Sequence, residues 1–320
     1  MAAGIALGID VDKLLNLYEA CGSRIFPARI RNARKFAFIS RGFFPMFLYP
    51  HEGKAGEGLG NVLREQLQPT ASAKLASSYQ PGNPVAIADI VKPVLLIPAY
   101  NTVKRRVDWF VSNNPTENSM WYDRTEVWKF CVCSASAPTF FSPYQLPTDS
   151  GEPETYIDGG VAVNNPALVA IAHAMFLPYK EDVEGCLKLD DISILSIGTG
   201  RSIEPFAYKD VKRWGLAQWA MRLNDLFIPA PNDVISSACW QMIRGEYPEN
   251  AKRILRLDFD IKLDDPEDKK LQKIDDPTLF NRFVEVAQNY LSNPESKVYI
   301  DIGEYQVPKD AIHNFIRQNK

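Results

Sequence analysis

The chain has 320 residues, of which 46% are hydrophobic and 23% are charged, as in an ordinary soluble globular protein. Its formal net charge of −3 gives no basis for nucleic-acid binding, and no apolar run is long enough to cross a bilayer. The five cysteines are widely spread and form no C-x-x-C pair. The sequence therefore predicts no metal site and no disulfide framework, and reduced thiols favour a cytoplasmic protein.

Helices and strands alternate along the first part of the chain. Residues 10–22 predict an amphipathic helix with Asp10 as its N-cap, and residues 58–67 predict a second, shorter helix. The continuous apolar run at 93–100 is typical of a strand buried on both faces, and residues 106–112 predict its neighbour.

The same alternation continues through the rest of the chain. The further elements are predicted as a helix at 124–138, a strand at 154–160, a helix at 164–176, a strand at 191–200 and a helix at 276–291. Among them DISILSIGTG, at 191–200, has the clearest pattern of a buried strand. Strands that alternate with helices imply an α/β fold with a mainly parallel sheet covered on both sides.

The candidate chemistry lies in YIDGGVAVNNPALVAIAHA, residues 156–174. Asp158 comes at the end of a predicted strand, where α/β sheets place functional groups. Gly159 and Gly160 permit a sharp turn that lets the carboxylate face a crevice. An Asp-Gly pair is also a common turn signal in which the aspartate caps its own backbone, so the tripeptide alone favours a simple turn.

The longer string resembles the aspartate motif of the patatin-like phospholipases, in which Asp-Gly-Gly is followed by Asn-Asn-Pro and an alanine-rich helix. Four other stretches resemble segments of the same family in the same order: LGIDVDKLLNLYEACGSRIF, KPVLLIPAYN, CSASAPTFFSP and ISILSIGTG. The resemblance implies a three-layer α/β/α acyl hydrolase domain over residues 1–293. A strand–helix extension is expected to follow at 294–320.

The resemblance also implies an activity. In this family a serine attacks the ester carbonyl of a lipid, and an aspartate takes up the serine proton without a histidine between them. Asp158 matches the catalytic aspartate, and Gly159 and Gly160 match the turn after it. The implied partner is a membrane lipid substrate that the protein meets at the membrane periphery, and no cofactor is implied.

The sequence departs from the family at the nucleophile. The family serine lies in a G-x-S-x-G elbow, and no such pattern occurs in these 320 residues. The register of MAAGIALGID places that serine a few residues before Met1, so we expect a hydrolase domain that lacks its N-terminal strands and its nucleophile. The alternative is a natural pseudoenzyme that binds lipid or a protein partner. A nucleophile at Ser134 or Ser136 is disfavoured, because neither lies in an elbow.

Residues 24–41 are rich in arginine and contain no acid, and aromatic residues lie in and just beyond them. Basic and aromatic residues together suit docking to an anionic membrane, here through Arg29, Arg31 and Arg34. The competing interpretation is a solvated basic face beside ordinary core aromatics, which is what most charge runs are.

Overall fold

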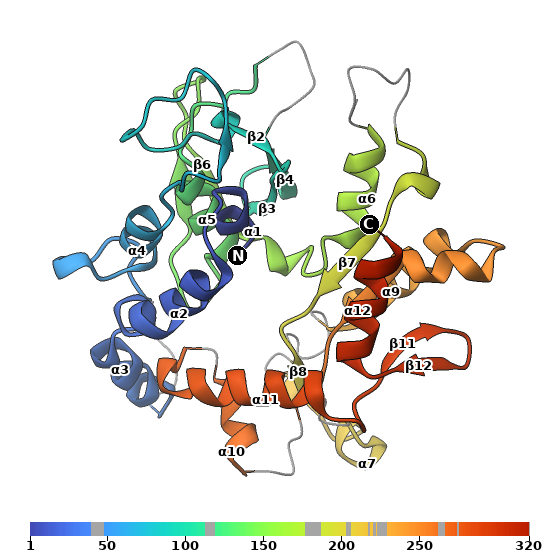
Figure 1. Cartoon of the computed structure of the whole chain (residues 1–320). Helices are drawn as coiled ribbons and strands as arrows, with labels where there is room; N and C mark the ends of the chain where they lie inside the picture. Colours follow the sequence, from blue (N-terminus) through green and yellow to red (C-terminus); the bar gives the residue numbers. More distant parts are fainter. Residues whose placement is uncertain are drawn as a thin grey trace. The chain divides into compact units, whose positions relative to one another are not determined.

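The structure is a computed structural model that divides into two compact units (Figure 1). The first comprises Met1–Val163 and Ile274–Phe280, and the second comprises Asn164–Lys273 and Asn281–Lys320. The division falls inside the 156–174 stretch, whereas the predicted boundary near residue 293 stays a prediction. The residues described are 1–39, 48–112, 119–176, 187–202, 206–216, 218, 219, 222, 229–261, 266–273 and 275–319.

The first unit contains a four-stranded sheet in the order β4-β3-β6-β5. Its strands are β3 (Leu96–Asn101), β4 (Arg106–Val111), β5 (Tyr144–Leu146) and β6 (Glu154–Asp158). All three pairings are antiparallel, and Ala99 of β3 lies opposite both Asp108 and Asp158. The expected α/β class is confirmed, but this sheet is not parallel. Four residues connect β3 to β4, and a parallel crossover needs a dozen or more.

The first unit also contains helices, and most of them were predicted from the sequence. Their bounds are α1 (Ala2–Ala6), α2 (Val11–Ile25), α3 (Ala28–Ile39), α4 (Leu59–Gln66) and α5 (Val127–Ala135), with a small pair of strands, β1 (Lys74–Leu75) and β2 (Ile90–Lys92), beside them. The predicted N-cap of α2 is confirmed, because the Asp10 side chain accepts a hydrogen bond from the Asp12 N–H at 2.8 Å.

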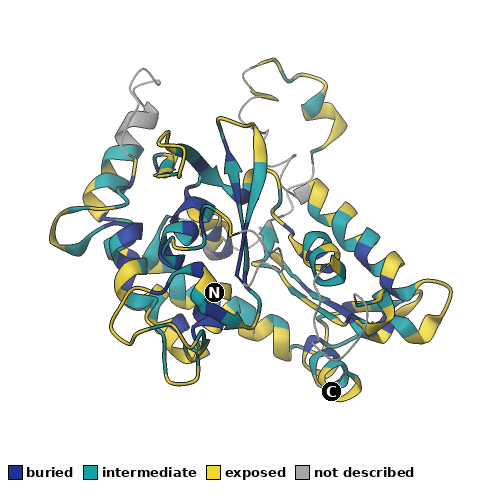
Figure 2. Ribbon diagram, turned by 90° about the horizontal axis from the view of Figure 1, so that it is seen from above, coloured by how far each residue is buried: buried dark blue, intermediate teal, exposed yellow. Residues whose placement is uncertain are grey.

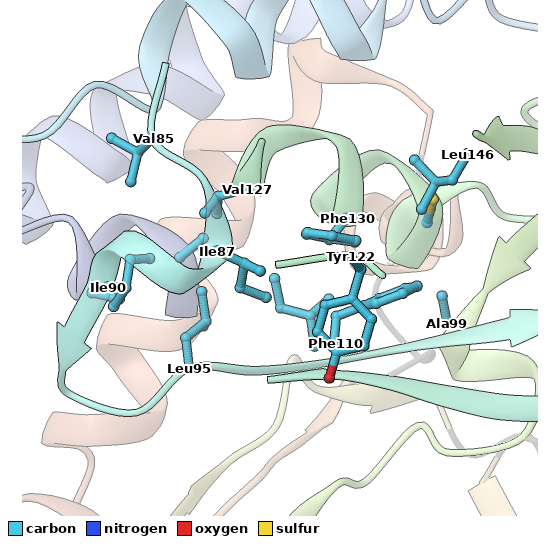
Figure 3. Packing of buried hydrophobic residues seen from close by; sticks show 14 of the residues in the cluster. Val85, Ile87, Ile90, Leu95, Ala99, Phe110, Tyr122, Val127, Phe130 and Leu146 are labelled. Atoms are coloured by element: carbon cyan, nitrogen blue, oxygen red, sulfur yellow. The ribbon is translucent and has the colours of Figure 1, made fainter. Parts of the chain in front are cut away.

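The core of the first unit lies between the sheet and α5. Phe110 of β4 and Phe130 of α5 are fully buried, with ring centroids 4.2 Å apart, and Tyr122 packs edge-on against Phe110 at 5.3 Å (Figure 3). Tyr156 of β6 joins the same cluster at 5.3 Å from Phe110. The strand that carries Asp158 is therefore anchored in the main core, which Figure 2 marks by burial.

The second unit combines helices with short parallel pairs. Its strands are β7 (Ile194–Ile197) beside β9 (Ile254–Leu257), β8 (Arg201–Ser202) beside β10 (Asp260–Ile261), and the hairpin of β11 (Val298–Asp301) and β12 (Glu304–Gln306). Its helices are α6 (Ala167–Phe176), α7 (Tyr208–Val211), α9 (Pro229–Arg244), α10 (Pro266–Lys269), α11 (Phe280–Ser292) and α12 (Pro308–Gln318). The first residue of α11, Phe280, belongs to the first unit. Across all the described residues, no helix combines the length and apolar character needed to span a bilayer.

The strand predicted at 191–200 is present as β7, but its predicted burial is wrong. Leu195 is 45% exposed and Ile197 is 68% exposed. In the described part of the chain β7 pairs only with β9, so its other edge has no neighbouring strand. An apolar run indicates that a strand needs covering on both faces, but it does not identify what covers it.

Candidate active site

Asp158 lies where β6 ends and passes into a single 3-10 turn, Gly159–Val161. Its main-chain N–H donates to the carbonyl of Ser136, at the end of α5, with an N–O distance of 3.0 Å. Its side-chain Oδ1 accepts a hydrogen bond from the Gly160 N–H at 2.7 Å. Within the described residues the other carboxylate oxygen, Oδ2, has no hydrogen bond, so it can accept a proton from another group.

The first glycine of the motif is required by a close contact with β3. Gly159 is buried, and a Cβ atom there would lie 2.5 Å from the carbonyl oxygen of Pro98. Side chains do not approach backbone atoms that closely, so only glycine fits without a shift of the strand. Gly160 contributes its N–H to the Asp158 carboxylate. The two glycines thus allow the turn and hold the carboxylate that precedes them.

The surroundings of Asp158 change its acidity. Burial raises the pKa of the Asp158 carboxyl, and the hydrogen bond from Gly160 offsets part of that rise by favouring the ionised form. A carboxylate with a raised pKa binds a proton more tightly and is a better general base for a hydroxyl group. The side chain therefore has the environment that a proton acceptor requires.

The Asn-Asn-Pro part of the motif begins α6 in the second unit. Asn165 is 2% exposed, and its Oδ1 accepts a hydrogen bond from the Ala167 N–H at 3.1 Å. Its amide nitrogen lies 3.0 Å from the hydroxyl oxygen of Ser236 in α9. The Asn165 side chain thus caps the start of α6 and also connects α6 to α9.

The two serines upstream of Asp158 do not have the geometry of nucleophiles. Ser136 is fully buried, and its hydroxyl donates to the carbonyl of Val132 at 2.6 Å. Ser134 lies within α5. Neither residue occupies a strand-to-helix elbow, so the structure agrees with the view that neither is the nucleophile.

The remaining candidates for acid–base or metal chemistry are separated along the fold. His51 lies 2.7 Å from the carbonyl oxygen of Ser142, and burial lowers its pKa, whereas His173 lies in α6 and His313 lies in α12. The described ranges contain no group of three or more His, Cys, Asp or Glu side chains placed to hold a metal ion. Four of the five cysteines fall within those ranges, and all four are free thiols.

The three arginines of the predicted membrane-docking surface lie on α3 and each has an acidic partner in the first unit. The pairs are Arg29 with Glu57, Arg31 with Asp276 at 3.2 Å, and Arg34 with Asp275 at 3.6 Å. Arg34 also stacks over the ring of Phe140 at 4.7 Å. These contacts favour a structural role, and docking stays a prediction. The aromatic residues at 43, 44 and 47 of the predicted docking surface lie outside the described residues.

Comparison with known proteins identifies the family. The patatin-like phospholipase family model matches residues 1–171, which include Asp158 and both glycines. Patatin-like protein 3 of Arabidopsis thaliana is 30% identical over 69% of this chain and 53% of its own length. The probable inactive patatin-like protein 9 of the same plant is 27% identical over 63% of this chain and 50% of its own.

Patatin-like protein 2 of Oryza sativa subsp. indica is 25% identical over 96% of this chain and 74% of its own length. The chain spans about half the length of the two Arabidopsis relatives. Its matched region contains the strand, the turn and the carboxylate described above. This chain belongs to the patatin-like phospholipase family.

Proposed function

We propose that this chain carries the general base of a lipid acyl hydrolase that works through a Ser-Asp dyad, with Asp158 as the base. The observation that supports this most directly is the state of the Asp158 carboxylate. One oxygen is fixed by the Gly160 N–H at 2.7 Å, the other has no hydrogen bond within the described residues, and burial raises the pKa of the group. Family membership supports the same chemistry.

In the proposed reaction the serine oxygen forms a bond to the ester carbonyl carbon while its proton passes to Asp158 Oδ2. The tetrahedral intermediate then breaks the ester bond, and Asp158 gives the proton to the departing alcohol. Water attacks the acyl-serine in the second half, with Asp158 again taking and returning the proton. The fatty acid leaves and the serine is restored, so atoms and charge balance over the cycle.

The serine in this proposal is expected in a G-x-S-x-G pattern, and that pattern does not occur in these 320 residues. The substrate is an ester of a membrane lipid, which the protein meets peripherally from the cytoplasm. The free thiols support the compartment, and the family description supports the substrate class.

Hydrolysis by an extended protein tests the proposal. We expect the chain with the G-x-S-x-G segment ahead of it to release fatty acid from phospholipid vesicles, and the 320-residue chain alone to release none. In the extended protein Asp158→Asn should lower kcat by about 10²–10⁴-fold, the usual contribution of a general base. Asp149→Asn, at an exposed position of the same unit, is the matched control. Unchanged hydrolysis in Asp158→Asn would refute the assignment of the base.

A second candidate function is a pseudoenzyme that binds lipid or a protein partner without hydrolysis. Two observations favour it: the sequence contains no G-x-S-x-G, and the name of one relative describes it as inactive. It predicts that the 320-residue chain sediments with phospholipid vesicles and that no longer form of the protein releases fatty acid.

A further inference from the structure

A partly buried polar cluster lies on the same face of β6 as Asp158. Side chains alternate along a strand, so Glu154, Tyr156 and Asp158 share one face. Asn101 of β3 lies directly opposite Tyr156, and both residues are fully buried. Asp108 of β4 completes the cluster, so its members come from three adjacent strands.

The hydroxyl of Tyr156 is at the centre of this cluster. It lies 2.8 Å from Glu154 Oε2 and 3.0 Å from Asp108 Oδ2. The side-chain amide of Asn101 donates to the same two oxygens, at 2.5 Å and 2.8 Å respectively. A buried group that loses such partners costs free energy, so these contacts hold the three strands in one register.

Two basic residues neutralise the carboxylates from the solvent side. Lys104 pairs with Glu154, and the Nε of Arg106 lies 3.0 Å from Asp108 Oδ1. Every carboxylate oxygen of the cluster therefore has a partner within the chain. The cluster has no unpaired charge to offer a ligand, which points to a role inside the protein.

The connection between the cluster and Asp158 is short. β6 pairs with β3 over three residue pairs, from Asn101 with Tyr156 at one end to Ala99 with Asp158 at the other. The cluster fixes the first end of this ladder. At the second end, Gly159 lies close to the carbonyl of Pro98, so the turn packs directly against β3. A change in the register at Tyr156 would thus reach Asp158 within two residues.

We propose that Tyr156 is a positioning residue for Asp158: by bridging Asp108 and Glu154, its hydroxyl holds β6 against β3 and β4 and keeps the Asp158 carboxylate partly buried beside Gly160. This proposal rests on the function proposed above for Asp158. In this proposal Tyr156 acts through Asp158 and takes no part in the proton transfer itself.

The pKa of Asp158 in the 320-residue chain tests the positioning role. Aspartate carboxyl carbons are followed by NMR through a pH titration, and the Asp158→Asn variant identifies the signal of Asp158. In Tyr156→Phe we expect the Asp158 pKa to fall toward its ordinary value by about 0.5 or more, because a loosened strand admits water to the carboxyl. The matched control is Tyr144→Phe on β5. Tyr144 lies opposite Tyr156, and no hydrogen bond of its hydroxyl is found in the described part of the chain, so its variant should leave the pKa unchanged.

A folded Tyr156→Phe variant with an unchanged Asp158 pKa would overturn the positioning role. If Tyr156→Phe does not fold, Asp108→Ala replaces it, since it removes one of the two carboxylates that the hydroxyl contacts and should move the Asp158 pKa in the same direction. An unchanged pKa in that variant would be equally decisive. Unchanged hydrolysis in Asp158→Asn would instead refute the proposed base, and these NMR measurements do not depend on that result.

Discussion

At the scale of the residue, the two carboxylate oxygens of Asp158 have different surroundings. Oδ1 caps the turn through Gly160, as an Asp-Gly pair commonly does, while Oδ2 has no hydrogen bond within the described residues. The turn interpretation and the catalytic interpretation of this residue are therefore compatible. The sequence could place Asp158 at a strand end, but it could not reveal the cluster around Tyr156, because Asn101 and Tyr156 are 55 residues apart in the chain.

The raised pKa of Asp158 predicts a pH-dependent cost in stability. When the pKa of a carboxyl is higher in the folded state than in the unfolded state, the protein loses stability as the pH rises through the folded-state pKa. The ionised Asp158 therefore lowers the free energy of unfolding at pH 7. Asp158→Asn removes the charge and retains an oxygen for Gly160. We expect it to raise the free energy of unfolding at pH 7, by about 1.4 kcal/mol for every pH unit that separates the folded pKa from the unfolded one.

Urea unfolding of both proteins across pH measures this effect. The difference should shrink as the pH falls through the Asp158 pKa and vanish below about 3.9, the ordinary value for an aspartate. A variant that is no more stable than the parent at pH 7 would show that burial of the ionised Asp158 carboxylate does not destabilise the folded protein.

Gly159 provides a second prediction at this scale. In Gly159→Ala the new methyl group would lie 2.5 Å from the carbonyl oxygen of Pro98, so β6 or β3 must move. We expect a loss of about 1–3 kcal/mol in the free energy of unfolding, the usual cost of overpacking. Gly215→Ala is the control, because the nearest atom there belongs to the flexible side chain of Gln218. Equal stabilities of the two variants would contradict the close contact.

At the scale of the element, the sequence predicted the existence of helices and strands better than their surroundings. The helices at α2, α4, α5 and α11 and the strands at β3, β4, β6 and β7 lie where the patterns placed them. The parallel arrangement was expected from alternation alone. The short link between β3 and β4 indicated a hairpin. It is stronger evidence than the alternation of helices and strands, because a link that short cannot carry the chain back to start a parallel strand.

The exposed face of β7 predicts self-association. Leu195 and Ile197 are exposed on a strand whose second edge has no partner within the described residues, which favours edge-to-edge pairing between molecules. Ile197→Lys should lower the weight-average mass measured by sedimentation at high protein concentration. Leu216→Lys, at a residue that is 89% exposed and outside the described strands, should not. Equal effects of the two substitutions would show that general hydrophobicity and not the strand edge is responsible.

At the scale of the whole molecule, the family match and the two compact units describe a patatin-like chain, and a catalytic role for its Asp158 is the proposal. The motif itself spans both units, with Asp158 in the first and Asn165 in the second. The sequence was sufficient to identify the family because several short segments kept their order and spacing. It could not show what covers the apolar side chains of β7, because an apolar run does not identify the element that packs against it.

The central claim is that Asp158 acts on a serine that these 320 residues do not contain. The intact mass of the protein from its native source, with sequencing of its N-terminal peptides, tests this most directly. We predict a product heavier than 36.1 kDa, with a G-x-S-x-G peptide ahead of AAGIALG. A native product that begins at Met1 would contradict the hydrolase and favour the lipid- or protein-binding pseudoenzyme.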